Sequence, residues 1–128
     1  MDLWNWMSDY EKRTGGNVLA IAHNGNLSNG IMFPIVDSFT GKDLDKTYAD
    51  IRSKWEPLYE ETQIKGDGEA HPFLSPNDDF ADYETWDQGN LDLSVAKENN
   101  MLQYEYARTG LQTGLQLEDK IGTNPYKF

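Results

Sequence analysis

The chain has 128 residues, the length of one domain, and 22 acidic residues against 11 basic ones give it a formal net charge of -11. This charge would repel a phosphate backbone, and no basic stripe compensates for it, so we predict no nucleic-acid binding. The absence of cysteine excludes disulfides and thiolate metal sites.

Apolar content is sufficient for one packed core. Hydrophobic residues make up 38% of the chain and aromatic residues 12%, which argues against disorder despite a mean hydropathy of -0.76. Residues 1–4 lack the features of a signal peptide, and no run approaches the roughly 18 apolar residues of a membrane span. We therefore expect a globular domain with long polar loops and no membrane segment in this chain.

The first predicted unit is a helix followed by a strand. Apolar residues recur at helical spacing over residues 2–13, with Asp2 placed to cap the helix and Gly15-Gly16 to end it. The apolar run over residues 17–22 predicts a strand buried on both faces of a parallel sheet. His23 follows this strand directly, at the end where α/β folds collect ligands.

An Asn- and Gly-rich loop over residues 23–43 separates this unit from the next. Loops of this length in compact domains are usually functional or mobile. Its apolar patch, residues 31–36, fits a short edge strand and fits equally a lid over the mouth of a site. Both interpretations stay open.

A second helix–strand unit follows. Apolar residues spaced by 4, 3, 4 and 3 from Leu44 to Leu58 predict an amphipathic helix, with Asp43 as its cap and Pro57 at its end. Residues 59–65 predict a strand that Gly66-Asp67-Gly68 terminates. The chain thus repeats the order helix, strand, polar cluster.

The C-terminal part is mostly loop and one helix. Residues 72–99 sustain no period and predict a long structured loop, with one helical turn near residues 82–86. Residues 100–120 predict the longest helix, for which Gly122 is the C-cap. Residues 123–128 predict the lead into a further strand.

The only two histidines, His23 and His71, both come just past predicted strands. Imidazole is the commonest metal ligand and also titrates near neutral pH, so this placement suits metal binding or acid–base chemistry. Asp67, Glu69 and Glu60 would add oxygen ligands, a mixture suited to Zn, Mn or Fe. The competing interpretation is that His23 hydrogen-bonds the loop backbone and organises the Asn-Gly turn.

Long motifs are distributed from one end of the chain to the other. They are LWNWM at residues 3–7 running on to TGG at 14–16, IAHNGNLSNG at 21–30, TQIKGDGEAHP at 62–72, LSPND at 74–78, FAD at 80–82, GNLD at 89–92 and NPYKF at 124–128. Through these motifs the chain resembles, essentially end to end, a mainly bacterial family catalogued as domain of unknown function 3604.

Members of that family are longer and look like relatives of the polymerase-and-histidinol-phosphatase (PHP) metal-dependent hydrolases, whose distorted α/β barrel carries a two- or three-metal cluster. The resemblance implies that residues 1–128 are a single partial domain, an internal α/β fragment of such a barrel. Of the PHP metal signatures, only the mid-chain His-Pro-Gly-Asn-like turn is matched. His23-Asn24-Gly25-Asn26 matches it, with Asn24 in place of proline.

The resemblance also suggests roles for individual residues. His23 is the expected metal ligand, and His71 is a second candidate ligand within the family's own motif. Glu60 matches a strand carboxylate found near the metal site of PHP proteins. The expected substrate-contacting or ligand-supporting residues are Asn24, Asn26, Glu60, Lys65, Asp67 and Glu69.

The main expectation is therefore a piece of a hydrolase in which a divalent metal, Zn, Mn or Fe, activates water for attack on a phosphoester or similar bond. We expect the isolated chain to be inactive, because one matched ligand cannot hold a metal cluster and the remainder of the parent domain is needed to complete the sheet. A second possibility is a non-enzymatic acidic module that binds a sugar or peptide through Asn24, Asn26, Asn29, Phe80, Tyr83 and Trp86. A third possibility is a structural piece without a ligand.

Overall fold

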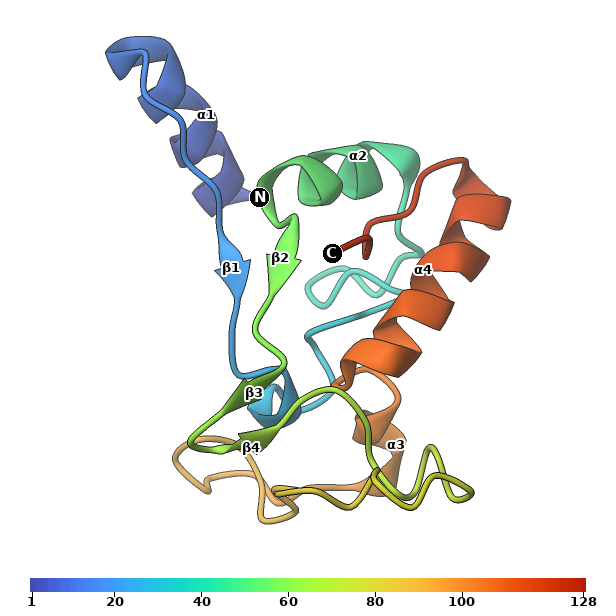
Figure 1. Ribbon diagram of the computed structural model, residues 1–128. Helices are drawn as coiled ribbons and strands as arrows, with labels where there is room; N and C mark the ends of the chain where they lie inside the picture. The colour runs from blue at the N-terminus through green and yellow to red at the C-terminus, as the bar shows by residue number, and fades with distance from the viewer.

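The computed structural model describes residues 1–128 as a mixed α/β structure with two small sheets and no closed barrel (Figure 1). None of its helices has the length and apolar character needed to cross a membrane. The elements in order are α1 (Asp2–Thr14), β1 (Ile21–Ala22), the 3-10 turn η1 (Gly25–Leu27), α2 (Lys46–Trp55), β2 (Leu58–Tyr59), β3 (Thr62–Gln63), β4 (Gly66–Asp67), α3 (Asn99–Leu102) and α4 (Ala107–Ile121).

The two predicted helix–strand units are present and lie side by side. Strand β1 pairs in parallel with β2, with Ile21 opposite Leu58 and Ala22 opposite Tyr59. The Glu60 amide donates to the Ala22 carbonyl at 2.9 Å, which extends the pairing to the end of both strands. In Figure 1, α1 and α2 lie at one end of this sheet and the antiparallel β3–β4 hairpin at the other. The carboxyl ends of β1 and β2 are therefore brought together.

The helix boundaries follow local capping. Helix α1 ends as predicted, at Gly15, whose φ of 71° is accessible without strain only to glycine. Helix α2 is shorter than predicted, and its cap is Asp45, whose carboxylate accepts the Tyr48 amide at 2.8 Å. The predicted cap, Asp43, instead forms an ion pair with Lys120 of α4.

The prediction of a strand buried on both faces was wrong. Strand β1 has two residues, and the Leu19 and Ile21 side chains are 50% and 56% exposed. The reason is that the sheet has only two strands, and Ile21 shares its open face with the half-exposed Leu58. The other face, at Tyr59, packs on Phe33.

The predicted strand over residues 59–65 is divided, because the chain turns back within it. Its first residue belongs to β2 and its middle to β3, and Gly66-Asp67 form β4 instead of ending a strand. Gly66 has a φ of 106°, and a Cβ there would lie 2.6 Å from the Glu84 carbonyl. Glycine is therefore required for the hairpin to lie against the long loop.

The predicted single helix over residues 100–120 is two helices, α3 and α4, separated at residues 103–106. Tyr106 has an extended backbone conformation, with φ of -104° and ψ of 139°, and both Glu105 and Tyr106 are fully buried. Gly122 is the C-cap as predicted. The predicted helical turn near residues 82–86 is absent, since these residues form a turn and bends followed by irregular chain, and residues 123–128 form no strand.

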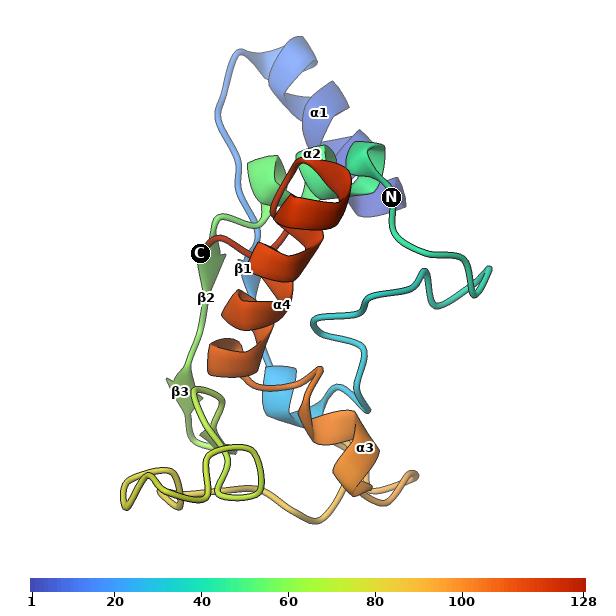
Figure 2. The ribbon, with the colours of Figure 1, turned by 90° about the vertical axis from the view of Figure 1, so that its right-hand side faces the viewer.

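Two small apolar clusters form the core. Phe33, Leu44, Leu117 and Tyr126 pack between the loop before α2, helix α4 and the C-terminal residues. Helix α4 approaches closely because position 110 is glycine, where a Cβ would lie 2.8 Å from the Phe33 ring. Figure 2 shows α4 in front of the β1–β2 sheet. The second cluster, between α1 and α2, consists of Trp4, Met7 and Trp55.

A buried ion pair connects segments that are far apart in the sequence. Lys97 Nζ lies 2.6 Å from Glu105 Oε2, and the two side chains are 5% and 0% exposed. Lys97 also donates to the Asn26 carbonyl, and the Gly30 amide donates to Glu105 Oε1 at 3.0 Å. The Asn26 side chain in turn donates to the Lys65 carbonyl at 3.0 Å. This network fixes the loop after β1 to the hairpin and to the start of α4.

We expect Lys97→Met to lower the free energy of unfolding by about 3–5 kcal/mol, because it leaves the Glu105 carboxylate buried without a partner. Urea unfolding followed by circular dichroism measures this change. The matched control is Lys12→Met, which removes an exposed pair with Asp9 and should cost less than about 1 kcal/mol. Equal losses in the two variants would contradict the role given to the buried pair.

Candidate functional site

His23 and Glu60 form a side-chain pair at the carboxyl ends of β1 and β2. His23 directly follows β1, Glu60 directly follows β2, and the parallel pairing places both at the same edge. His23 Nδ1 contacts Glu60 Oε2, and the two side chains are 47% and 41% exposed. The structure thus brings together the predicted metal ligand and the predicted strand carboxylate.

The chemistry of this pair depends on which ring nitrogen of His23 contacts Glu60. An ionised carboxylate only accepts hydrogen bonds, so Nδ1 of His23 carries the proton that Glu60 accepts. In the neutral ring the lone pair is then on Nε2, which has no partner within the chain. Histidines that bind metals have this same arrangement, with the second ring nitrogen donating to a carboxylate.

The turn that follows His23 is shaped by its own three residues. Asn24 has a φ of 59°, and its side-chain oxygen accepts from Gln63 at 2.7 Å. A Cβ at Gly25 would lie 2.1 Å from the Tyr59 hydroxyl and 2.8 Å from the Glu105 carbonyl. Asn26 is buried in the network described above. These three residues organise the Asn-Gly turn, while the His23 ring contacts Glu60.

His71 occupies a different, buried position. Its Nδ1 accepts the Phe73 amide at 3.1 Å, so Nε2 carries the proton and donates to Asp87 at 2.9 Å. The ring centroid lies 5.2 Å from that of Tyr106. Both nitrogens are engaged in holding the loop after β4. A metal bound at His71 would have to replace one of these hydrogen bonds.

The other predicted residues near His71 shape the same loop. Asp67 is buried and accepts the amides of Glu69 and Ala70, each at 3.2 Å. The Glu69 carboxylate pairs with Arg108 of α4 at 3.0 Å. Lys65 lies in the hairpin turn, where its carbonyl accepts from Asn26. Structural contacts therefore occupy the backbone or side chain of each of these residues.

The donor set is too small for a complete metal site within the chain. No group of three or more His, Asp or Glu side chains lies close enough together to hold a metal ion. His23 and Glu60 supply two donor groups, whereas zinc sites take three or four from the protein. The pair fits part of a metal site and requires further ligands from elsewhere.

A cavity of about 440 Å³ lies beside His23. The Arg52 guanidinium lines it, donates to the Tyr48 hydroxyl at 3.0 Å and pairs with Glu56 at 3.2 Å. The spacing of four between Arg52 and Glu56 on a helix was a signal that sequence reasoning missed. No such signal predicts Lys97 and Glu105, because their contacts come from the tertiary fold.

The residues of the predicted sugar- or peptide-binding module have different environments. Phe80 and Tyr83 are exposed, and the Trp86 indole donates to the Gly89 carbonyl at 2.8 Å. Asn26 is buried. Asn24 lines the cavity beside His23, and Trp86 lines a different cavity beside the hairpin.

We expect Gly25→Ala to lower the free energy of unfolding by about 1–3 kcal/mol, because the new Cβ overlaps the Tyr59 hydroxyl and the Glu105 carbonyl. Thermal unfolding measures the loss. Adding Tyr59→Phe should restore part of it, since the Glu105 contact remains. The control is Gly16→Ala, whose Cβ would meet only the Thr14 and Tyr10 side chains, at 3.3 Å or more. Equal stability of the two alanine variants would contradict this packing.

Comparison with known proteins places the chain in a family. The family described as "Protein of unknown function (DUF3604)" matches over residues 1–128. No curated protein and no solved structure matches the chain. Because the match spans every residue, the chain belongs to the DUF3604 family.

Proposed function

We propose that this chain contributes part of the active site of a metal-dependent hydrolase, in which His23 binds a divalent Zn, Mn or Fe ion through Nε2. The observation that carries the proposal is the contact between His23 Nδ1 and Glu60. It leaves Nε2 without a partner in the chain, at the carboxyl ends of two parallel strands, where α/β proteins place their ligands.

Glu60 has a positioning role in this proposal. Its carboxylate accepts the Nδ1 proton, holds the imidazole ring in one orientation and increases the electron density at Nε2. The Glu60 amide donates to the Ala22 carbonyl, and this hydrogen bond fixes the position of the backbone that carries the Glu60 side chain. The ring is thus preoriented although it is half exposed.

His23 alone supplies too few donors for a metal site. We infer that the remaining ligands come from other parts of a PHP-like α/β barrel, of which residues 1–128 would be a central portion. The resemblance of the His23-Asn24-Gly25-Asn26 turn to a PHP metal signature supports this inference, as do the two open edges of the β1–β2 sheet. The metal would activate water for attack on a phosphoester or similar bond.

A metal titration followed by NMR tests the ligand assignment, since only two histidines contribute imidazole signals. We expect millimolar Zn²⁺ to shift the Nε2 resonance of His23. The His71 signals should stay in place, because both of that ring's nitrogens are engaged in a buried site. The His23→Ala variant should lose the response.

The Glu60→Gln variant tests whether the Glu60 carboxylate orients His23 as a metal ligand, or whether His23 binds metal only as any exposed imidazole does. Removing a carboxylate that supports a metal-bound histidine weakens metal affinity by about 10–100-fold, and we expect a loss in that range. The control is Glu61→Gln, which alters an exposed neighbour outside the pair. Equal Zn²⁺ affinity in Glu60→Gln and the unaltered chain would contradict the proposal, as would an unresponsive His23.

A further inference from the structure

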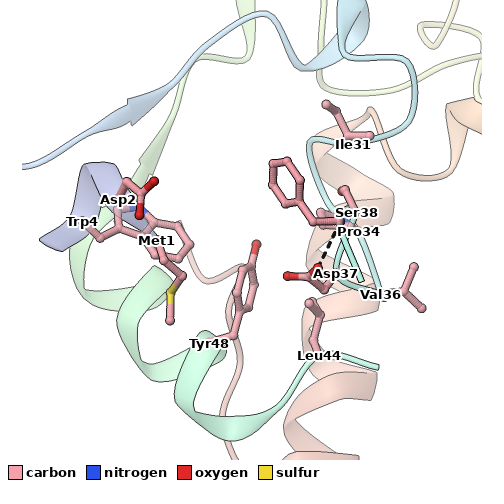
Figure 3. A pocket seen from close by; sticks show the side chains of 11 residues that line it. Met1, Asp2, Trp4, Ile31, Pro34, Val36, Asp37, Ser38, Leu44 and Tyr48 are labelled. Atoms are coloured by element: carbon pink, nitrogen blue, oxygen red, sulfur yellow. Dashed lines mark hydrogen bonds between the residues drawn. The ribbon is translucent and has the colours of Figure 1, made fainter. Parts of the chain in front are cut away.

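The cavity of about 440 Å³ beside His23 is large enough for a small molecule and has a mainly apolar lining. Trp4, Ile31 and Tyr48 line it and also a neighbouring cavity, in which the Tyr48 ring lies between Trp4 and the loop that carries Ile31 (Figure 3). The neighbouring cavity extends to Met1, whereas the cavity beside His23 includes no residue before Trp4. The apolar and aromatic residues that line the cavity beside His23 are Trp4, Leu27, Ile31, Met32, Tyr48 and Leu91.

Arg52 and Glu56 are the charged side chains that line this cavity, and they neutralise each other. Arg52 Nε lies 3.2 Å from Glu56 Oε2, and the two side chains are 7% and 17% exposed. The Arg52 guanidinium also donates to the Tyr48 hydroxyl at 3.0 Å and to the Met32 carbonyl at 2.6 Å. An anion would have to compete with Glu56 for the guanidinium, and a cation would have to compete with Arg52 for the carboxylate. The pair therefore favours a ligand group without charge.

The other polar side chains in the lining also have partners within the chain. The Trp4 indole donates to Glu56 at 2.9 Å, and the Asn24 side-chain oxygen accepts from Gln63 at 2.7 Å. The Ser28 hydroxyl oxygen accepts a backbone amide at 3.1 Å. A ligand rich in hydroxyl groups would lose hydrogen bonds to water on entering this cavity and would regain few of them. The lining therefore disfavours a sugar.

Two aromatic rings in the wall are held in fixed orientations. Trp4 is buried, and its ring meets that of Tyr48 edge to face, with centroids 5.4 Å apart. The hydrogen bonds of Trp4 to Glu56 and of Tyr48 to Arg52 add to this restraint. Rings that are already ordered bind a flat apolar group with little further loss of side-chain entropy. The cavity thus fits a neutral aromatic group better than a charged or hydroxylated one.

We propose that the cavity beside His23 binds a neutral aromatic group of the substrate, next to the bond that is hydrolysed. That this group belongs to a substrate rests on the proposed function, and its basis is that His23 itself lines the cavity. The substrate class is then an aryl ester of phosphoric or a similar acid, in preference to a sugar ester. Binding of the aromatic group alone requires no metal.

Benzyl alcohol is the probe, since it is neutral and aromatic. The control ligands are myo-inositol, a hydroxylated six-membered ring, and inorganic phosphate, an anion. The measurement is the indole N–H signal of Trp4 in NMR spectra recorded without metal. We expect benzyl alcohol to shift this signal saturably and the two controls to leave it nearly unchanged. Trp6, which is 54% exposed and stacks on Tyr10 outside the cavity, is an internal control for non-specific aromatic contact.

Two leucines of one loop supply matched variants. Leu91 and Leu93 are 61% and 54% exposed, and of the two only Leu91 lines the cavity. Because both side chains are largely exposed, neither alanine variant should unfold the chain. We expect Leu91→Ala to weaken benzyl alcohol binding at least about threefold, since it removes apolar contact surface. The Leu93→Ala variant should bind as the unaltered chain does.

Three results would overturn the proposal: a Trp4 response to myo-inositol or phosphate equal to that to benzyl alcohol, a Trp6 shift that parallels the Trp4 shift, or equal affinities of the two leucine variants. Loss of binding in a longer protein that contains residues 1–128 would also overturn it, because another part of that protein would then fill the cavity. Because no metal is present, failure here leaves the assignment of His23 untouched. Failure of the Zn²⁺ titration would likewise leave benzyl alcohol binding untouched.

Discussion

The buried pair of Lys97 and Glu105 is the interaction on which the arrangement of this chain depends. Burying two charges is costly, and the cost is offset only when each charge has several well-placed partners. Here Glu105 accepts both Lys97 and the Gly30 amide, and Lys97 also donates to the Asn26 carbonyl. The segments that carry these groups must therefore meet in one geometry, although small apolar clusters alone would permit others.

The constraint extends from this pair to the candidate site. The loop that Lys97 and Glu105 hold begins immediately after His23, and Asn26 within it also binds the hairpin that follows Glu60. The segments that follow His23 and Glu60 are thus both held in place by buried hydrogen bonds, and this fixes the contact between the two side chains. The half-exposed imidazole is thereby oriented by buried groups.

Features that neighbouring residues determine were predicted from the sequence, whereas features that depend on tertiary contacts were not. Glycine at positions 15 and 122 marks helix ends that local backbone conformation determines, and both were predicted. The resemblance to PHP proteins suggested that Glu60 lies near the metal site, but residues 59–65 were predicted as one strand with Glu60 inside it. In the structure β2 ends at Tyr59, so Glu60 lies at the strand end beside His23. The break between α3 and α4 was not predictable, because Glu105 continues a helical pattern in the sequence and only the folded chain supplies its partners. Strand β1 is exposed on one face for a similar reason, since an apolar run does not reveal how many strands will cover it.

Native-state hydrogen exchange of the Gly30 amide measures how firmly the buried pair of Lys97 and Glu105 holds the loop after β1. This amide donates to Glu105 Oε1, so its exchange reports whether the buried pair holds the loop. We expect this amide to exchange only through global unfolding, with the same opening free energy as the Gly110 amide inside α4. Exchange as fast as that of the exposed Ser38 amide would show that the loop opens freely, and would contradict a role of Lys97 and Glu105 in positioning the site.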